Sequence, residues 1–223
     1  CRGCRDFAAT CVQRNSLENL NCPGAREGTM KEIASIMGVE TQPEAKRLVA
    51  VLRCAGSCKV RPIRYTYDGA SNCAVMNAVG VGSRECSWGC LACGDCTSAC
   101  RFGALKIDPG TGLPLVDTSM CTGCGLCVDE CPLSLLELRP AGRRERRVWV
   151  ACSSHDRGAV ARRQCKAACI GCGKCAKECP FDAITLAGNL AYINPDKCKA
   201  CGKCVATCPT GAIHATFEIK QPS

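Results

Sequence analysis

The stretch Cys169-Ile-Gly-Cys172-Gly-Lys-Cys175-Ala-Lys-Glu-Cys179-Pro180 places four cysteines within eleven residues. Its spacing, Cys-x2-Cys-x2-Cys-x3-Cys, recurs in the runs that begin at Cys90, Cys121 and Cys198. The runs at Cys90 and Cys169 lie 79 residues apart, and each is followed by another run 31 or 29 residues later. The chain therefore contains two copies of one unit, at residues 90–131 and 169–208.

The composition argues against an ordinary single-core enzyme. Cysteine supplies 26 of the 223 residues, and aromatic residues make up only 4%. The hydrophobic share of 47% includes those cysteines. Without them the share falls to roughly 35%, which is thin for a core of this size. Disulfides or metal centres are therefore expected to hold the chain together.

The cysteine spacing distinguishes between these two possibilities. Four cysteines in this order are typical of bacterial ferredoxins that bind [4Fe–4S] clusters, and three of the runs also have the closing proline. The run at Cys90 has Arg101 instead. Zinc sites favour isolated Cys-x2-Cys pairs, and cysteines this dense on tight loops cannot all reach disulfide geometry. We interpret each unit as a two-cluster ferredoxin module.

Four ligand sets follow from the ferredoxin pattern, in which the last cysteine of each run binds the neighbouring cluster. The expected sets are Cys90, Cys93, Cys96 and Cys131; Cys121, Cys124, Cys127 and Cys100; Cys169, Cys172, Cys175 and Cys208; and Cys198, Cys201, Cys204 and Cys179.

Ten cysteines lie outside these runs. Two groups of four either hold one further cluster each, for about six [4Fe–4S] clusters in all, or are buried inert thiols. These groups are Cys1, Cys4, Cys11 and Cys22 at the amino end, and Cys54, Cys58, Cys73 and Cys86 in the middle. Cys152 and Cys165 are expected to be structural thiols, because the nearness of His155 in the sequence does not establish a nucleophile.

We predict an α+β chain with little regular secondary structure. Its expected parts are an amino-terminal iron–sulfur domain at 1–46, a middle cysteine-rich segment at 47–89, the first ferredoxin module at 90–138, a linker with a strand–helix insertion at 139–168, and the second module at 169–223. A capping box at Thr29 and a closing Gly38 predict one helix. We also expect a strand at 148–151, a helix at 158–168 and a solvated arginine-rich stretch at 139–147.

The formal charge of +9 does not indicate nucleic-acid binding. A [4Fe–4S] core with four thiolates contributes about −2, so six clusters would bring the chain to about −3. Aromatic residues for base stacking are also scarce. The sequence contains no run of 18 apolar residues and no signal peptide. Because it starts without Met, we expect residues upstream, where a membrane anchor could lie.

Several segments together resemble the RnfB family, the polyferredoxin subunits of Rnf complexes. They are Cys54-Ala-Gly-Ser-Cys58, Cys73, Cys86-Ser-Trp-Gly-Cys90-Leu, and Val150-Ala-Cys152-Ser-Ser between the modules. Gly3-Cys4-Arg-Asp-Phe7-Ala8 and Cys22-Pro23-Gly24 are similar to the second half of that family's amino-terminal cluster domain. The resemblance covers nearly the whole chain.

This resemblance implies an electron-transfer subunit that receives electrons from reduced ferredoxin at the cytoplasmic face of the cell membrane. It implies partners that include membrane-embedded and flavin subunits, and coupling to Na⁺ or H⁺ translocation. The chain itself has no flavin, nicotinamide or nucleotide motif, so it is not expected to catalyse hydride transfer alone. The alternatives are a soluble relay subunit of another flavin- or hydrogenase-based complex, an electron-storage polyferredoxin and a zinc-stabilised scaffold.

Three positions depart from the family's pattern. Cys93 falls where an apolar residue is expected, so Cys86 is an alternative ligand, and Arg101 replaces a proline. Cys4 and Cys22 match the last two positions of the amino-terminal pattern. Either the other two ligands lie upstream of residue 1, or Cys1 and Cys11 replace them.

The two modules differ in charge, which suggests where a partner docks. Residues 86–138 have a balance of −4, whereas residues 152–223 have a balance of +5. Five lysines lie within two residues of expected ligands in the second module: Lys174, Lys177, Lys197, Lys199 and Lys203. Small ferredoxins are usually acidic, so we expect electrons to enter through this module.

Overall fold

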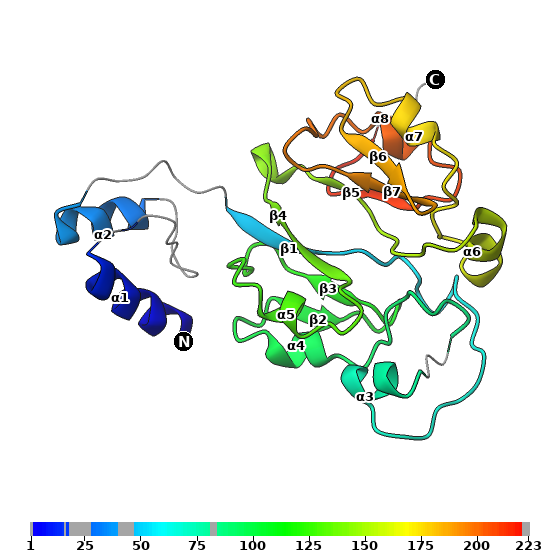
Figure 1. Ribbon diagram of the computed structural model, residues 1–223, viewed down its shortest axis with the longest axis horizontal. Helices are drawn as coiled ribbons and strands as arrows, with labels where there is room; N and C mark the ends of the chain where they lie inside the picture. Colours follow the sequence, from blue (N-terminus) through cyan, green and yellow to red (C-terminus); the bar gives the residue numbers. More distant parts are fainter. Residues whose placement is uncertain (1, 16, 18–27, 40–46, 81–83, 220–223) are drawn as a thin grey trace.

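The computed structural model describes residues 2–15, 17, 28–39, 47–80 and 84–219 (Figure 1). Its elements are, in order, α1 (Arg2–Arg14), α2 (Thr29–Met37), β1 (Leu48–Leu52), α3 (Cys73–Ala78), α4 (Asp95–Ala99), β2 (Leu105–Ile107), β3 (Pro114–Val116), α5 (Leu126–Asp129), β4 (Leu136–Pro140), η1 (Arg143–Glu145), β5 (Val148–Val150), α6 (Gly158–Gln164), α7 (Lys174–Lys177), β6 (Ile184–Ala187), β7 (Leu190–Ile193), α8 (Lys203–Ala206) and β8 (Ile213–Ala215). The predicted α+β chain with little regular secondary structure is confirmed. Within the described ranges, the helices are all too short or too polar to cross a membrane.

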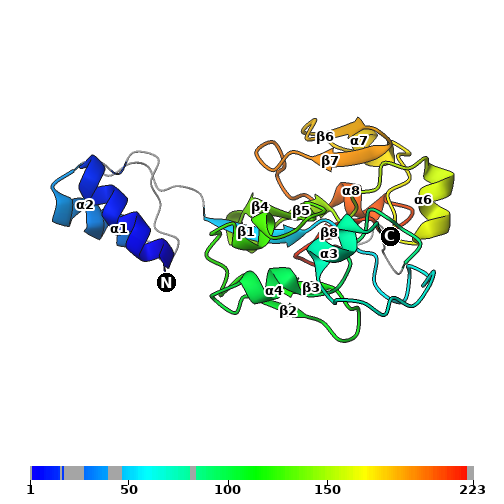
Figure 2. The same cartoon turned by 60° about the horizontal axis from the view of Figure 1, so that its bottom comes forward.

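Two units of six elements repeat one topology. In the first, β1 pairs antiparallel with β4, and β2 pairs with β3 in a hairpin flanked by α4 and α5. In the second, β5 pairs with β8, and the hairpin β6–β7 is flanked by α7 and α8. The two units lie at opposite ends of the main body in Figure 1 and in the turned view of Figure 2. Each unit has its own buried cluster of side chains.

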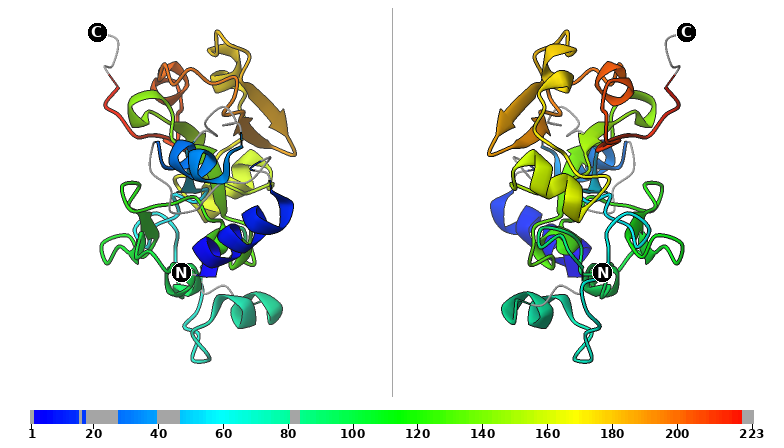
Figure 3. Two further views of the ribbon diagram at one scale, coloured as in Figure 1. Left: turned by 90° about the vertical axis from the view of Figure 1, so that its left-hand side faces the viewer. Right: turned by 90° about the vertical axis from the view of Figure 1, so that its right-hand side faces the viewer.

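The first strand of each unit stands well before the cysteine run that follows it. Residues 53–94 separate β1 from α4, and residues 151–173 separate β5 from α7. Each intervening segment contains one helix, α3 or α6. Figure 3 shows α3 at the end of the molecule farthest from the second unit. The first unit therefore has the longer insertion.

The predicted solvated stretch at residues 139–147 is exposed at 142–146, but the prediction was wrong at both ends. Arg139 is 2% exposed and Arg147 is 6% exposed. Leu136–Pro140 forms β4, and Nη1 of Arg147 donates to the carbonyl of Ala141 at 2.6 Å and to Glu145 at 2.9 Å. These oxygens bind Nη1 of the guanidinium and support its burial, although the buried Nε of Arg147 has no hydrogen-bond partner.

Three smaller predictions can be compared with the structure. The strand is present as Val148–Val150, but the helix after it ends at Gln164, before Cys165. The helix at Thr29 ends at Gly38, whose φ of 65° is the left-handed conformation that closes helices. Thr29 is its first helical residue, however, so the capping position falls to Gly28 rather than to Thr29.

Arg139 joins the two units. Its Nε lies 2.9 Å from Glu137 Oε1, and its Nη1 donates to the carbonyl of Val148 in β5 at 3.3 Å. Its guanidinium carbon lies 5.2 Å from the ring centroid of Tyr192 in β7, whose hydroxyl is 3.0 Å from Glu137 Oε1. One buried cation thus connects β4 with two strands of the second unit.

Replacing Arg139 by Met should lower the free energy of unfolding by about 3 kcal/mol, because Glu137 loses the nearer of its two arginine partners in a partly buried site. Anaerobic urea unfolding followed by circular dichroism measures this change. Arg143→Met, at an exposed arginine nearby, is the control and should change stability by less than about 0.5 kcal/mol. Equal effects of the two substitutions would contradict this role of Arg139.

Candidate iron–sulfur centres

Five hollows in the described part of the chain are each lined by four cysteines. The first hollow contains Cys73, Cys90, Cys96 and Cys131, and the second contains Cys100, Cys121, Cys124 and Cys127. The third contains Cys54, Cys86, Cys152 and Cys165. The fourth contains Cys169, Cys172, Cys175 and Cys208, and the fifth contains Cys179, Cys198, Cys201 and Cys204. The empty space in each, including its open mouth, is about 290 Å³ to 420 Å³.

The second, fourth and fifth hollows bring together three of the sets expected from the spacing. In each, three cysteines come from one run and the fourth comes from the end of the other run in the same unit. The β pairings cause this exchange, because they place the two runs of a unit face to face. The apolar side chains beside the sulfurs come from both the strands and the segments that connect them.

Glycines let the loops of these runs pass close to the neighbouring backbone. Gly123 and Gly171 precede Cys124 and Cys172 and have φ values of 70° and 65°. A Cβ at Gly171 would lie 2.7 Å from the carbonyl oxygen of Asn189, and one at Gly123 would lie 2.5 Å from that of Leu48. A larger residue would therefore push the loop away and move the following cysteine.

The first hollow differs from the expected set in one position. Cys73 lines it together with Cys90, Cys96 and Cys131, and Cys93 does not. Cys73 begins α3, and its N–H donates to Asp95 at 2.8 Å, which holds the insertion against the loop of the run. The Sγ of Cys93 lies 3.1 Å from Sδ of Met76, one turn along α3. Cys93 is thus a fifth thiol beside the site.

The structure does not bring the expected middle group together. Cys73 lies in the first hollow, whereas Cys54 and Cys86 lie in the third with Cys152 and Cys165. Cys58 is exposed, and its Sγ lies 3.6 Å from the carbonyl of Gly110. The suggested use of Cys86 as a ligand in place of Cys93 therefore does not match its position.

The amino-terminal group lies largely outside the described residues. This applies to Cys1, Cys22 and the side chain of Cys4. Cys11 is buried between α1 and α2, in a cluster with Leu17 and Ala34.

Neither histidine adds to these sites. Nδ1 of His155 lies 3.1 Å from the carbonyl of Gly188, and its ring packs edge-on against Trp88 at 5.1 Å. His214 packs against Trp149, and burial lowers the pKa of its imidazole. Both arrangements are structural.

Burial raises the pKa of many thiols in the hollows. Desolvation, with added negative charge from Cys90 and Cys131, raises the pKa of Cys96 to about 12. Desolvation and the charge of Cys198 likewise raise the pKa of Cys204 to about 12. Four thiolates in one such place repel each other unless a cationic core lies between them, so binding iron there must release protons.

Backbone amides also face the sulfurs. The N–H of Leu135 donates to Sγ of Cys131, and that of Ala183 donates to Sγ of Cys179, both at 3.4 Å. In both contacts the donor is the fourth residue after the last cysteine of a run. Hydrogen bonds to ligand sulfurs stabilise their negative charge and are one of the factors that set the potential of an iron–sulfur cluster.

The donor sets fit a cluster better than a single ion. In the ranges that the structure describes, no three Cys, His, Asp or Glu side chains are placed to hold one metal ion. In a [4Fe–4S] cluster each thiolate binds a different iron, so the four sulfurs surround a space instead of converging on one point. Hollows with four spread thiols and otherwise apolar walls meet that requirement.

Comparisons with known proteins agree with this donor set. A family model described as a 4Fe-4S dicluster domain matches residues 89–135 and 168–212, and a second model of that description matches residues 117–183. The chain binds [4Fe–4S] clusters in these two domains.

Three curated relatives match over 88% of the chain. The B component of the Na(+)-translocating ferredoxin:NAD(+) oxidoreductase complex of Acetobacterium woodii is 40% identical over 57% of its own length. The proton-translocating counterpart of Clostridium ljungdahlii is 38% identical over 67% of its length. The B component of the ion-translocating oxidoreductase complex of Methanosarcina acetivorans is 38% identical over 72% of its length. The chain belongs to the RnfB family. It spans little more than half of the Acetobacterium relative.

The dicluster matches leave part of this RnfB-family chain unassigned. They contain every cysteine of the second, fourth and fifth hollows. Cys54, Cys73 and Cys86 lie outside all of the matches, and Cys152 and Cys165 lie only in the match at 117–183. A sequence signal for the third hollow does exist: Cys86 and Cys165 each stand four residues before the first cysteine of a module.

Proposed function

We propose that this RnfB-family chain relays electrons from reduced ferredoxin, at the cytoplasmic face of the cell membrane, to membrane-embedded and flavin subunits of an Rnf-type ferredoxin:NAD⁺ oxidoreductase coupled to Na⁺ or H⁺ translocation. Family membership and the hollows lined by four cysteines support this function. Each bound [4Fe–4S] cluster accepts and releases one electron. The chain's own residues hold the thiolates, exclude water from them and present a docking surface.

The docking surface that we assign to ferredoxin lies on the second module. Cys172 and Cys201 are exposed there, so two of the thiolates reach the surface. Lys199 and Lys203 line the fifth hollow beside Cys201, and both are exposed. Lys174 and Lys177, on α7, are exposed as well. An acidic partner would be attracted to this surface and would arrive close to the exposed thiolates.

The exposed cysteine in a hollow of the first module has different surroundings. Cys124 of the second hollow is exposed in the first module, and the nearby Asp129 and Glu130 are exposed acidic residues. This charge repels an acidic donor. We therefore assign the first module to the partners that receive electrons.

Replacing Lys174, Lys177, Lys199 and Lys203 by Glu should slow reduction of the chain by reduced ferredoxin about tenfold or more at low ionic strength, because steering is lost. Anaerobic stopped-flow absorbance at several salt concentrations measures the rate. In the unaltered chain the rate should fall with salt, whereas in the variant this dependence should weaken or invert.

The matched control makes the same charge change on the other part of the chain, at Lys59, Arg64, Arg101 and Lys106, which are all exposed. It should leave the rate within about twofold of the unaltered chain, because these residues lie away from the proposed surface. Equal rates for both variants, with iron content intact, would exclude the second module as the docking site.

Affinity purification of the tagged chain from its native membranes tests the assembly. Co-purification of membrane-embedded and flavin subunits is the expected result. Recovery with only soluble flavin or hydrogenase subunits would instead favour the relay subunit of another redox complex.

A further inference from the structure

The third hollow carries a site that no ferredoxin run includes. Its four thiols are all buried, with exposures of 8% for Cys54, 9% for Cys86, 8% for Cys152 and 5% for Cys165. The Sγ atoms of Cys54 and Cys165 lie within 3.5 Å of one point, the position that a Cβ on Gly56 would occupy. Two cysteines from each insertion thus meet at one place, although 98 residues separate Cys54 from Cys152.

The internal repeat relates these two pairs of cysteines. Cys54 follows the end of β1 by two residues, and Cys152 follows the end of β5 by two. Cys86 stands four residues before Cys90, and Cys165 stands four before Cys169. Each unit therefore contributes one cysteine after its first strand and one before its first run. A site made of two equivalent halves is what two copies of one unit produce when they pack around an approximate twofold axis.

The backbone holds the two halves together. The N–H of Ala55 donates to the carbonyl of Ala151 at 2.8 Å, and the hydroxyl of Ser153 donates to the carbonyl of Arg53 at 3.1 Å. The sulfurs also accept backbone hydrogen bonds: Cys54 from the N–H of Cys90, and Cys152 from the N–H of Ser154, both at 3.5 Å. These donors favour negative sulfur in both halves.

A buried arginine provides an independent indication of negative charge in this hollow. Arg61 lines the hollow and is only 3% exposed. Its guanidinium donates to the carbonyl of Cys90, but its buried Nε has no hydrogen-bond partner, and no carboxylate of the described residues pairs with it. A buried cation without a counter-ion is costly, whereas a cluster with four thiolates, at about −2, would compensate it.

We propose that Cys54, Cys86, Cys152 and Cys165 bind a further [4Fe–4S] cluster, which joins the two ferredoxin modules. This assignment rests on the thiols of the chain and on Arg61, and it stands whether or not ferredoxin is the donor. It replaces the expectation that Cys152 and Cys165 are structural thiols.

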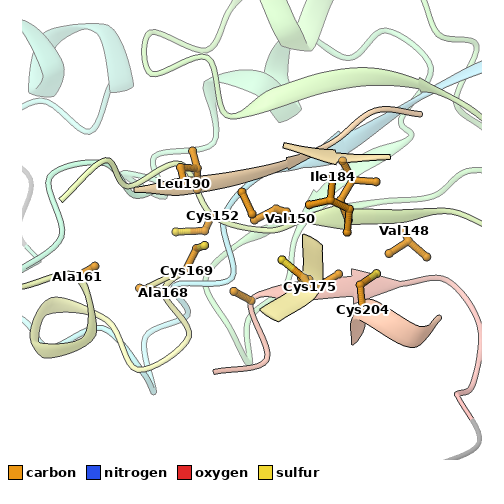
Figure 4. Close-up of a cluster of buried hydrophobic side chains, with 14 of the residues drawn as sticks. Val148, Val150, Cys152, Ala161, Ala168, Cys169, Cys175, Ile184, Leu190 and Cys204 are labelled. Carbon is orange, nitrogen blue, oxygen red and sulfur yellow. The ribbon is translucent and has the colours of Figure 1, made fainter. Parts of the chain in front are cut away.

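The position of the third hollow makes it a link between the modules. On one side, Cys54 accepts a hydrogen bond from Cys90 of the first hollow. On the other, Cys152 lies against Cys169 of the fourth hollow, as Figure 4 shows. Within the modules, Cys96 is close to Cys127, and Cys175 is close to Cys204. The five hollows thus form one row, in the order second, first, third, fourth and fifth.

This order gives the site a role in electron transfer. A single electron moves from one reduced cluster to its oxidised neighbour, and no atom is transferred. Tunnelling rates fall steeply with distance, so a row interrupted in its middle would separate the two modules. The third site would close that gap.

The test is the iron and acid-labile sulfide content of the full-length chain, purified anaerobically. Cys152→Ser and Cys86→Ser, one from each half, should each remove about four iron atoms and four sulfides per chain. The other clusters should remain, which their electron paramagnetic resonance signals show. Cys58→Ser is the matched control, because this exposed cysteine belongs to the same insertion but lies outside the hollow. It should keep the full iron content.

Arg61→Gln gives a second readout that does not depend on removing a ligand. Loss of its positive charge should shift the midpoint potential of one cluster to a more negative value, because the added electron is then less stabilised. The remaining clusters should keep their potentials. Unchanged iron in both serine variants would overturn the proposal, and so would zinc in place of iron or a Cys54–Cys165 disulfide found by thiol titration and mass spectrometry.

Discussion

Removing the iron–sulfur clusters should unfold both ferredoxin modules. Each sheet has only two strands, and these strands are three to five residues long, which is marginal in water without further support. In the core of the second module, six of the sixteen buried residues are cysteines, and several of the others are alanines (Figure 4). Metal–thiolate bonds supply the missing energy; a structural zinc site provides on the order of 10 kcal/mol.

Anaerobic treatment with ferricyanide and a chelator, followed by far-ultraviolet circular dichroism, measures this dependence. The cluster-free chain should lose most of its strand signal and its cooperative thermal transition. A sample given the chelator without the oxidant is the control and should keep both its iron and its spectrum. A cluster-free chain that still unfolded cooperatively would show that side-chain packing alone is sufficient.

Cys73→Ser should remove about four iron atoms per chain, whereas Cys93→Ser should leave the iron content unchanged. The reason is the position of the two thiols: Cys73 lines the first hollow, and Cys93 faces Met76. This result would be the opposite of what the spacing of the run at Cys90 predicts. Iron and sulfide analysis after anaerobic purification measures it.

Cys96→Ser is the positive control for this experiment, because Cys96 lines the same hollow and belongs to the run. It should lose as much iron as Cys73→Ser. Loss of iron only in Cys93→Ser would show that Cys93, as the spacing predicts, is the ligand and that Cys73 is not. Retention of iron in both single variants, with loss in the double variant, would mean that either thiol can complete the site.

The sequence predicts those parts of the site that depend on short spacing. Three thiols in Cys-x2-Cys-x2-Cys order occupy one loop, and the fourth follows from the repeat of the unit. The sets of the second, fourth and fifth hollows have this local origin. The hairpin strands next to them were also predictable, because Gly188-Asn189 separates two short apolar segments.

The rest depends on tertiary contacts that spacing does not encode. Cys73 enters the first hollow because α3 folds back against Asp95, and the second unit has no equivalent of this part of the insertion. The third hollow needs two insertions to meet across the units, although the alignment of Cys86 with Cys165 in the repeat was a usable signal. Arginine is usually exposed, so the burial of Arg139 was predictable only from its partners.

The exposure of the cysteines also orders the sites by their sensitivity to air. Oxidants attack accessible sulfur first, and Cys124, Cys172 and Cys201 are exposed in the second, fourth and fifth hollows. Among the five described hollows, only the third has four buried cysteines. Brief contact with oxygen should therefore damage the second, fourth and fifth sites before the first and third. A partly inactivated preparation would then keep its central site after it has lost the sites where electrons enter and leave.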